Sequence, residues 1–536
     1  MFGFSISTKG ILTDNYYKKL GYYEKPEPQG AYVMIRKYKD KIILNQDFHG
    51  SFGLYTYENK EKNYFAISNS FLLLGEYLVG KQNFSFNKEF ADNLIISRLY
   101  TYSLNETMIK EIAQLPRNTF IIINIKNKSF QIHDIDYKEN TIPIETPDGL
   151  KIIDKWVDKW GFIFRSLKKQ TDIISCDLSG GFDTRIVLSV LINSGINLNE
   201  ILIHSVNDTK HVHMEDFKIA SNISSKLGFK LNRLRIGNKG KIWSIKDSIS
   251  CTMYSKLGFH KEFYFKKIFF DNPRFSFNGN GGEDLRGSPG CPIKNYVEKV
   301  STTDMPIYSK EFYNSSKNLI NRSIDYLKQK KNYSNDFDIS YDLYSRIVDK
   351  NHFGRSAVEA FISNVYLIQP LMDPEIKKIK FEIHNSSPHD LIAFIYTRFA
   401  NDLISFPFQG KRILNVDSIR KANKLNSKLL PYKIKSDYNK DFFIDFERKS
   451  PVKQSKENKN INKFLSNLFE SEGFLNLILK TYDIKLYNWS KDYINKTNYH
   501  PLKHHFALLA VAVTTELISV NEKILFKKMR KNLKKN

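Results

Sequence analysis

The clearest chemical signal in this sequence is a short turn that contains Ser179, Gly180, Gly181, Asp183 and Thr184. It follows an apolar run and precedes a segment with helical spacing. Consecutive glycines at a helix N-terminus let unpaired backbone N–H groups approach a phosphate closely. The two hydroxyl groups can donate to the same phosphates, and the carboxylate suits a Mg²⁺ ion lying between. The pattern predicts a nucleotide-binding loop, and the alternative is an ordinary tight strand–helix turn.

The segments around this turn predict a parallel α/β sheet, because strand and helix patterns alternate after residue 150. The expected strands are 172–178, 200–206 and 275–277, and the expected helices are 150–167, 185–193 and 214–227. A second glycine-rich turn, 278–284, follows the last of these strands. Residues 1–140 have mostly strand patterns, including a hairpin at 119–135, and residues 138–150 have the composition of a linker. Beyond residue 310 we expect mainly helices, with a basic polar loop at 448–463.

Composition narrows the class of protein. The chain has 536 residues with 41% hydrophobic residues, enough for two or three folded domains. Three cysteines cannot form a disulfide scaffold, no apolar run approaches the roughly 20 residues of a membrane span, and the N-terminus is not a signal peptide. We expect a cytoplasmic protein. The net charge of +25 is interpreted first as a lysine-rich surface, then as a sign of an anionic substrate, and only third as nucleic-acid binding.

The turn at 179–184 resembles the pyrophosphate loop of the asparagine synthetase-like ATP pyrophosphatases, whose pattern is Ser-Gly-Gly-x-Asp-Ser/Thr. Three further segments agree in order: 214–228 is similar to the family's acidic-start helix, 278–284 to its second glycine signature, and 369–374 to its Pro-Phe-Leu-Asp element. The resemblance implies an N-terminal Ntn-hydrolase-like domain at 1–140 and an ATP-dependent ligase domain at 141–536. It also implies that ATP is cleaved between its α and β phosphates to activate a carboxylate, which an amine then takes as an amide.

The resemblance also assigns residues to roles. Gly279, Asn280 and Gly281 would contact the nucleotide, and Glu283 would share Mg²⁺ with Asp183. In the family the metal-binding acid of the second signature is Asp followed by Glu, and here the two are interchanged as Glu283 and Asp284.

Lys411 matches the family's catalytic lysine, which stabilises the charge on the pentacovalent phosphorus. Arg412, Lys449 and Lys453 are alternatives, as is an ordinary surface lysine. Relatives that form β-lactams use a Tyr–Glu pair to deprotonate the amine, but the corresponding positions here are Asn280 and Tyr366. The amide-forming base is therefore unassigned.

The N-terminal part departs from glutamine-using relatives, because the position of their nucleophilic cysteine holds Phe2. We expect a shortened scaffold without glutaminase activity. The preferred function is an ATP- and Mg²⁺-dependent ligase that joins a carboxylate to ammonia or an amine, and the favoured carboxylate is that of an acidic surface-glycan sugar. The alternatives are a peptide or natural-product cyclase, a catalytically impaired scaffold, and a nucleic-acid modifier, for which no RNA-binding module is visible. The sequence does not indicate an oligomeric state.

Overall fold

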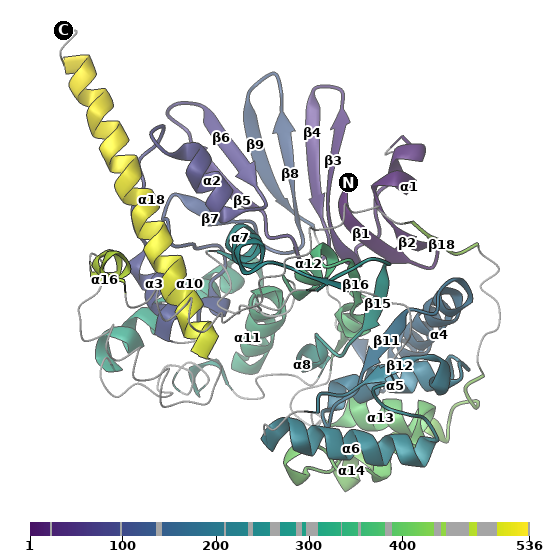
Figure 1. The fold of residues 1–536 in the computed structure, drawn as a ribbon. Coiled ribbons are helices and arrows are strands. Elements are labelled where there is room, and N and C mark those ends of the chain that lie inside the picture. Colours follow the sequence, from purple (N-terminus) through teal and green to yellow (C-terminus); the bar gives the residue numbers. More distant parts are fainter. Residues whose placement is uncertain are drawn as a thin grey trace.

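The computed structural model of this chain is an α/β structure (Figure 1). It describes residues 1–21, 24–96, 99–135, 142–207, 211–233, 240–257, 268–285, 292–295, 298, 309–333, 335–351, 355–380, 389–433, 441–445, 471–479 and 501–533. The predicted loop at 448–463, with Lys449 and Lys453, lies outside these residues. Within them, no helix combines the length and the apolar character that crossing a membrane requires.

The N-terminal part is rich in strands, as the sequence predicts. Its largest sheet has seven strands, in the order β18 (Phe443–Ile444), β2 (Gly10–Leu12), β1 (Phe2–Ser7), β3 (Gly30–Tyr38), β4 (Lys41–Gln46), β8 (Thr119–Asn124) and β9 (Ser129–Asp134). The predicted hairpin is confirmed as the antiparallel pair β8 and β9. A second sheet has the order β6 (Tyr64–Ser68), β5 (Tyr55–Asn59) and β7 (Ile112–Gln114). This part also contains the helices α1 (Asp14–Lys19), α2 (Phe71–Leu78) and α3 (Lys88–Ile96).

One edge strand of the seven-stranded sheet comes from far along the chain. Strand β18 pairs in parallel with β2, and the carboxylate of Asp445 accepts hydrogen bonds from the Tyr16 N–H and the Thr13 hydroxyl, both at 2.7 Å. No local pattern in the sequence predicts this pairing. The N-terminal sheet therefore contains segments that lie more than 400 positions apart in the sequence.

The predicted parallel sheet is confirmed. Its four strands run in the order β12 (Leu202–His204), β11 (Ile174–Asp177), β15 (Arg274–Phe277) and β16 (Val365–Ile368), and every neighbouring pair is parallel. Helix α5 (Phe182–Asn193) follows β11 and helix α6 (His211–Leu227) follows β12. Both helices begin earlier than the sequence predicts, so Asp183 and Thr184 lie in the first turn of α5.

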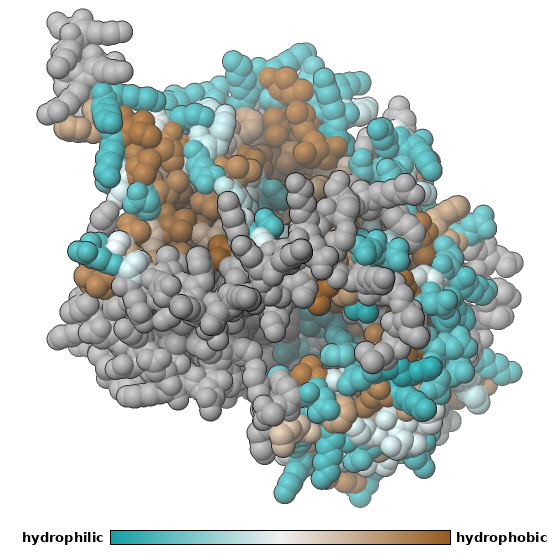
Figure 2. Space-filling view, in the orientation of Figure 1, coloured by the Kyte–Doolittle hydropathy of each residue, from teal (hydrophilic) through white to brown (hydrophobic). Residues whose placement is uncertain are grey.

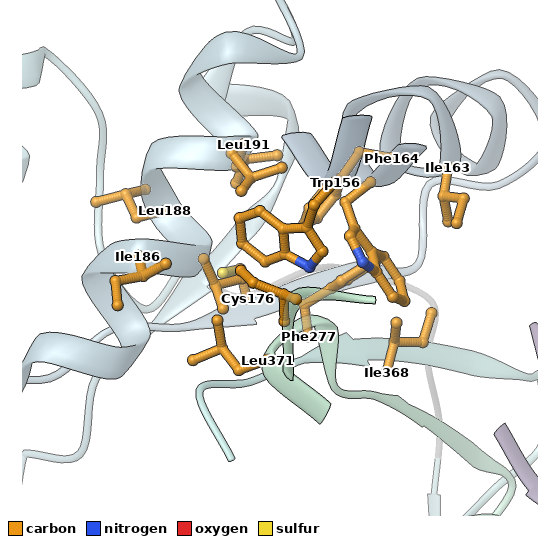
Figure 3. Close-up of a cluster of buried hydrophobic side chains, with 14 of the residues drawn as sticks. Trp156, Ile163, Phe164, Cys176, Ile186, Leu188, Leu191, Phe277, Ile368 and Leu371 are labelled. Atoms are coloured by element: carbon orange, nitrogen blue, oxygen red, sulfur yellow. The ribbon is translucent and has the colours of Figure 1, made fainter. Parts of the chain in front are cut away.

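Helix α4 (Pro147–Gln170) packs its apolar face on this sheet. Trp156 and Phe164 of α4 lie with Phe277 and Ile368 of the strands in one buried cluster (Figure 3). The rings of Phe164 and Phe277 stack with centroids 3.8 Å apart. This packing fixes the sheet against α4, and side chains of α4 also contact the segment that follows β16.

The prediction of a linker at 138–150 is wrong over its second half. Helix α4 already begins at Pro147, and the short strand β10 (Ile142–Pro143) pairs in parallel with β17 (Ile379–Lys380). The Thr146 hydroxyl accepts a hydrogen bond from the Gly149 N–H at 3.1 Å. Proline at the first helical position, preceded by a threonine cap, marks a helix start, although the same residues also punctuate linkers.

The later part of the chain is mainly helical, as predicted. Its helices are α7 (Ile245–Lys256), α8 (Gly282–Leu285), α10 (Ser309–Lys330), α11 (Asp336–Leu343), α12 (Arg355–Ile362), α13 (Asp390–Phe399), α14 (Val416–Asn426), α16 (Glu472–Leu479) and α18 (Pro501–Leu533). The outer part of α18 extends beyond the sheets (Figure 1). Figure 2 shows apolar side chains along α18 and over the neighbouring strands, and Ile35 of β3 and Ile132 of β9 are among the exposed apolar residues.

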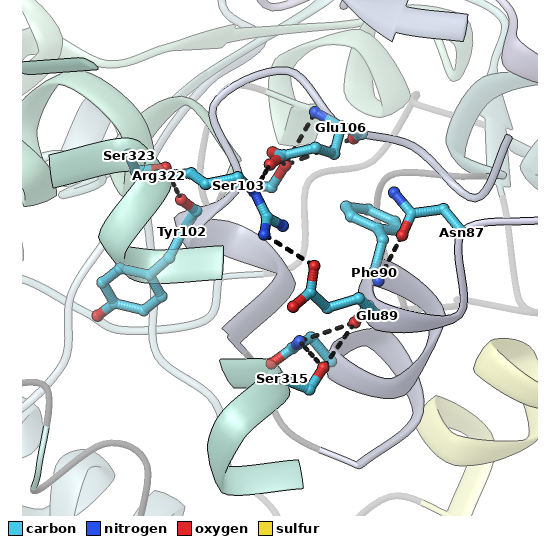
Figure 4. Close-up of polar contacts among 10 residues, drawn as sticks. Asn87, Glu89, Phe90, Tyr102, Ser103, Glu106, Ser315, Arg322 and Ser323 are labelled. Carbon is cyan, nitrogen blue, oxygen red and sulfur yellow. Dashed lines mark hydrogen bonds and ion pairs between the residues drawn. The ribbon is translucent and has the colours of Figure 1, made fainter. Parts of the chain in front are cut away.

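Both large hydrophobic cores contain residues from each side of position 140. One joins Phe4 and Ile121 to the parallel sheet, and the other joins α2 and α3 (Lys88–Ile96) to α10, α11 and α18. Polar contacts cross the same boundary (Figure 4). Arg322 of α10 contacts the carboxylates of Glu89 and Glu106, each at 2.8 Å. The division into 1–140 and 141–536 stays a prediction.

Candidate active site

The first glycine turn connects β11 to α5 at the carboxyl edge of the parallel sheet. Ser179 and Thr184 face each other across it, because the Ser179 N–H donates to the Thr184 Oγ1 at 3.0 Å and their hydroxyl oxygens lie 3.1 Å apart. Gly181 has extended backbone and caps α5. The structure therefore confirms that the loop follows a buried strand and lies at a helix N-terminus.

The amides of the two glycines are hydrogen-bonded within the protein. The Gly180 N–H donates to Asp216 Oδ1 of α6 at 2.8 Å, and the Gly181 N–H donates to the Ser179 Oγ at 3.1 Å. Burial raises the pKa of the Asp216 carboxyl, and the hydrogen bond from Gly180 opposes that rise. A phosphate that uses both amides must therefore displace two side-chain oxygens, one of which belongs to an acid in the predicted acidic-start helix.

The second glycine turn packs directly on Asp183. A Cβ added at Gly282 would lie 2.2 Å from Asp183 Oδ1, and one added at Gly279 would lie 2.6 Å from the Thr184 nitrogen. Side chains at either position would overlap these atoms, so the close approach requires glycine. The turn thus brings its backbone, and Glu283 at the start of α8, next to the first turn of α5.

The carboxylates of Asp183 and Glu283 suit a Mg²⁺ ion whose other ligands come mainly from a bound substrate. Among the described residues no group of three or more His, Cys, Asp or Glu side chains is arranged to hold a metal ion. Mg²⁺ usually takes only one or two protein carboxylates and completes its shell with phosphate oxygens and water. Asp183 and Glu283 remain the predicted pair.

Neither candidate for a base in the second half-reaction is suited to that task. The Asn280 side-chain amide donates to the Ser356 hydroxyl of α12 at 3.2 Å, and an amide cannot accept a proton at neutral pH. Tyr366 is fully buried, and its ring packs 5.0 Å from that of Phe4 and 5.2 Å from that of Phe275. Tyr366 therefore belongs to the hydrophobic core of the sheet.

The turn that carries Lys411 lies beside the first glycine turn. The Gln409 N–H donates to the Gly180 carbonyl at 3.0 Å, and the Gly410 N–H donates to Glu215 Oε1 at 2.8 Å. Gly410 and Lys411 both have left-handed backbone, with φ of 71° and 57°. Left-handed backbone at a non-glycine residue costs on the order of 1 kcal/mol, so the surrounding hydrogen bonds must hold Lys411 in it. Lys411 and Arg412 are both exposed.

The segment similar to Pro-Phe-Leu-Asp is held from two sides. From α4, the Trp156 indole donates to the Pro370 carbonyl at 3.0 Å, and the Lys159 ammonium lies 2.7 Å from the Asp373 carboxylate. From the N-terminal part, Gln29 donates to the Gln369 carbonyl at 3.1 Å. The segment in turn packs on the second glycine turn, since a Cβ at Gly281 would lie 2.6 Å from Met372 Cγ.

His49 makes a further link from the N-terminal part to this segment. Its Nε2 lies 2.7 Å from the Met372 carbonyl oxygen, as a hydrogen-bond donor, and Nδ1 lies 3.5 Å from the carboxylate of Asp349. Lys377 lies 2.5 Å from the same carboxylate. Burial, followed by the charge of Lys377, lowers the pKa of His49 to about 3, so the imidazole is neutral at physiological pH. Sequence reasoning missed His49.

Sequence reasoning also missed Arg185, the residue after Thr184. It is fully buried, and its guanidinium contacts the backbone on both sides of the site. The available signal is a charged residue at the start of the largely apolar run 185–191. No known protein family's sequence profile matches this chain, and no curated protein shows significant similarity to it.

Proposed function

We propose that this protein is an ATP- and Mg²⁺-dependent ligase that forms an amide from a carboxylate and an amine. The observation that carries the proposal is the meeting of two glycine turns at the carboxyl ends of the adjacent parallel strands β11 and β15, with the Lys411 turn hydrogen-bonded to the first. Ligands of open parallel sheets bind at this edge. The helix N-terminus and Asp183 supply what a magnesium-bound polyphosphate requires.

In the proposed reaction, a carboxylate oxygen attacks the α-phosphorus of ATP while the bond from that phosphorus to the bridging oxygen breaks. Pyrophosphate leaves with the bonding electrons, and the glycine turns would hold it. Asp183 and Glu283 would hold the Mg²⁺ ion, which would neutralise the charge of the leaving pyrophosphate. The Lys411 ammonium stabilises the charge on the phosphorus. The amine nitrogen then attacks the acyl carbon, and the bond from that carbon to the phosphate oxygen of AMP breaks. AMP leaves with the bonding electrons, and the amine proton passes to solvent water.

The substrates we favour are the carboxyl group of an acidic sugar and free ammonia or a substrate amine. The excess of Lys and Arg over acidic residues suits an anionic partner, with a net charge of +25 for the chain. Glutamine is not the proposed donor, because Phe2 stands where a cysteine nucleophile is required. Closure of a ring in a peptide or small natural product is the alternative within the same chemistry.

The test is release of pyrophosphate and AMP from ATP, measured over a panel of sugar and peptide carboxylates with ammonia or simple amines. AMP formation that depends on one carboxylate supports the proposal, and ADP formation contradicts it. An Asp183→Asn variant controls for contaminating enzymes, since it should release no pyrophosphate.

A second candidate is a protein that binds nucleotide at this site but no longer catalyses ligation. It is favoured by the engagement of both glycine amides by Asp216 and Ser179, together with Asn280 and the buried Tyr366. Binding of Mg²⁺–ATP without AMP formation from any carboxylate in the panel would support it.

A further inference from the structure

Arg185 is a buried cation at the junction of two loops of the candidate site. Its side chain is 0% exposed, and it follows Asp183 and Thr184 in the first turns of α5. One guanidinium nitrogen donates to the Gly180 carbonyl at 3.1 Å and to the Pro407 carbonyl at 2.5 Å. The other terminal nitrogen donates to the Phe406 carbonyl at 3.2 Å. Arg185 thus joins the first glycine turn to the segment that leads to Lys411.

The surroundings of Arg185 are carbonyl groups and an aromatic ring. The centre of the guanidinium lies 4.0 Å from the centroid of the Phe408 ring. No carboxylate in the described part of the chain forms an ion pair with Arg185. Burial lowers its pKa to about 10, which leaves it charged at neutral pH. The negative charge of Asp216 partly opposes this lowering, although Asp216 forms no ion pair with Arg185. Burying a charge without a direct ion pair is costly, so a role for this side chain that an apolar residue could not fill is indicated.

The Gly180 carbonyl is shared by both loops. It accepts from Arg185 and also from the Gln409 N–H, at 3.0 Å. Phe408 is held at the same time, since its N–H donates to the Arg412 carbonyl at 2.7 Å. The planar arginine fork donates from two nitrogens to three carbonyl oxygens in fixed directions, and the single ammonium nitrogen of lysine cannot reproduce that geometry.

We infer that Arg185 is a positioning residue that clamps the Lys411 turn onto the first glycine turn. This inference rests on the proposed function for the role of Lys411, whereas the clamp itself does not depend on catalysis. With the clamp in place, the left-handed backbone of Lys411 is held at a fixed place beside Gly180. Without it, the segment from Phe406 to Lys411 would keep fewer contacts to the loop.

The first experiment measures amide hydrogen exchange of residues 406–412 in the full-length protein without nucleotide. Arg185→Lys and Arg185→Met should each raise exchange at Gln409 and Phe408 about tenfold or more, because the segment that contains these amides loses its contacts to Arg185. The matched control is Arg398→Met. The Arg398 side chain is similarly buried, at 7% exposed, but its Nε and one terminal nitrogen donate to the two carboxylate oxygens of Asp154, each at 2.8 Å. Arg398→Met should leave amide hydrogen exchange of residues 406–412 unchanged. Unchanged exchange in folded Arg185→Lys overturns the inference.

The second experiment is a double-mutant cycle between Arg185 and Lys411, read in the rate of pyrophosphate release. Arg185→Lys alone should lower kcat about tenfold to a hundredfold, the scale of a displaced catalytic group. In a Lys411→Ala background the same change should lower kcat less than about twofold, because Arg185 acts through Lys411. Independent, multiplying effects overturn the positioning role. If wild-type protein releases no pyrophosphate, the proposed function fails, and the exchange experiment still decides whether Arg185 clamps the turn.

Discussion

A single added methyl group at Gly282 should disable the candidate site. The Cβ of Gly282→Ala would lie 2.2 Å from Asp183 Oδ1 and 2.6 Å from Asp183 Cβ. Rotation of the carboxylate relieves the first contact but not the second, because the Cβ does not move with χ1. Restoring an ordinary contact of about 3.4 Å to the Asp183 Cβ therefore requires a shift of roughly 1 Å between the two turns.

The size of the effect follows from that shift. A misplacement of about 1 Å at a reacting group lowers rates about 10²-fold, and overpacking costs about 1–3 kcal/mol of stability. We expect Gly282→Ala to lower pyrophosphate release about a hundredfold and to lower the melting temperature by a few degrees.

The assay is coupled pyrophosphate detection with saturating Mg²⁺–ATP, beside calorimetric melting of the same samples. Gly473→Ala is the matched control, because no atom lies within 4 Å of a Cβ added at this position in α16. It should keep wild-type turnover and melt at or slightly above the wild-type temperature. Wild-type turnover and melting in Gly282→Ala would refute the packing of the second turn on Asp183.

Four further experiments test the metal site, the catalytic lysine, the amine donor and the protonation of His49. Asp183→Asn should abolish nucleotide-dependent pyrophosphate release while the melting curve stays unchanged, and retained activity would remove Asp183 from the metal site. Lys411→Ala should still bind ATP in calorimetric titration but lose turnover by about 10² or more, and a wild-type rate would direct attention to Lys449 or Lys453. Glutamine should yield no glutamate above background, with or without ATP, and turnover that requires residues 1–140 would contradict this. The pKa of His49 is lowered to about 3 in the folded state, so between about pH 6.5 and pH 3 the unfolded state binds one more proton than the folded state. The free energy of unfolding of the wild type should therefore fall as the pH decreases through this window, by up to about 1.4 kcal/mol per pH unit relative to His49→Gln. Denaturant melts of the two proteins across this window measure the difference. Equal slopes for the two proteins would show that His49 titrates normally.

The parts of the fold that follow from local patterns could be predicted from the sequence. The turn at 179–184 lies between an apolar run and a helical pattern, so its place at a sheet edge depends only on neighbouring residues. The hairpin of β8 and β9 is local in the same sense. The start of α4 is not predicted correctly from the sequence, because threonine and proline occur both in linkers and at helix starts.

The contacts that hold the site together are not local, and the sequence carries little sign of them. The bond from Gly180 to Asp216 spans two elements, and the bond from Gln409 to the Gly180 carbonyl joins residues more than 200 positions apart. The only sign of Arg185 in the sequence is a charge at the start of a largely apolar run, and an arginine that faces solvent would give the same pattern. Such pairings depend on how the whole sheet packs, so no spacing rule identifies them.

The late arrival of strand β18 also constrains how the protein matures on the ribosome. Strand β2 is complete after residue 12, but its parallel neighbour begins at Phe443. At the usual 5–20 residues per second of synthesis, the edge of the first sheet waits roughly 20 to 90 seconds for its partner. During that interval β2 presents unpaired backbone groups, which are a template for pairing with other chains. The nascent N-terminal sheet should therefore be the stage at which chaperone binding matters most, and a stalled chain released before residue 443 should aggregate more readily than one released after residue 445.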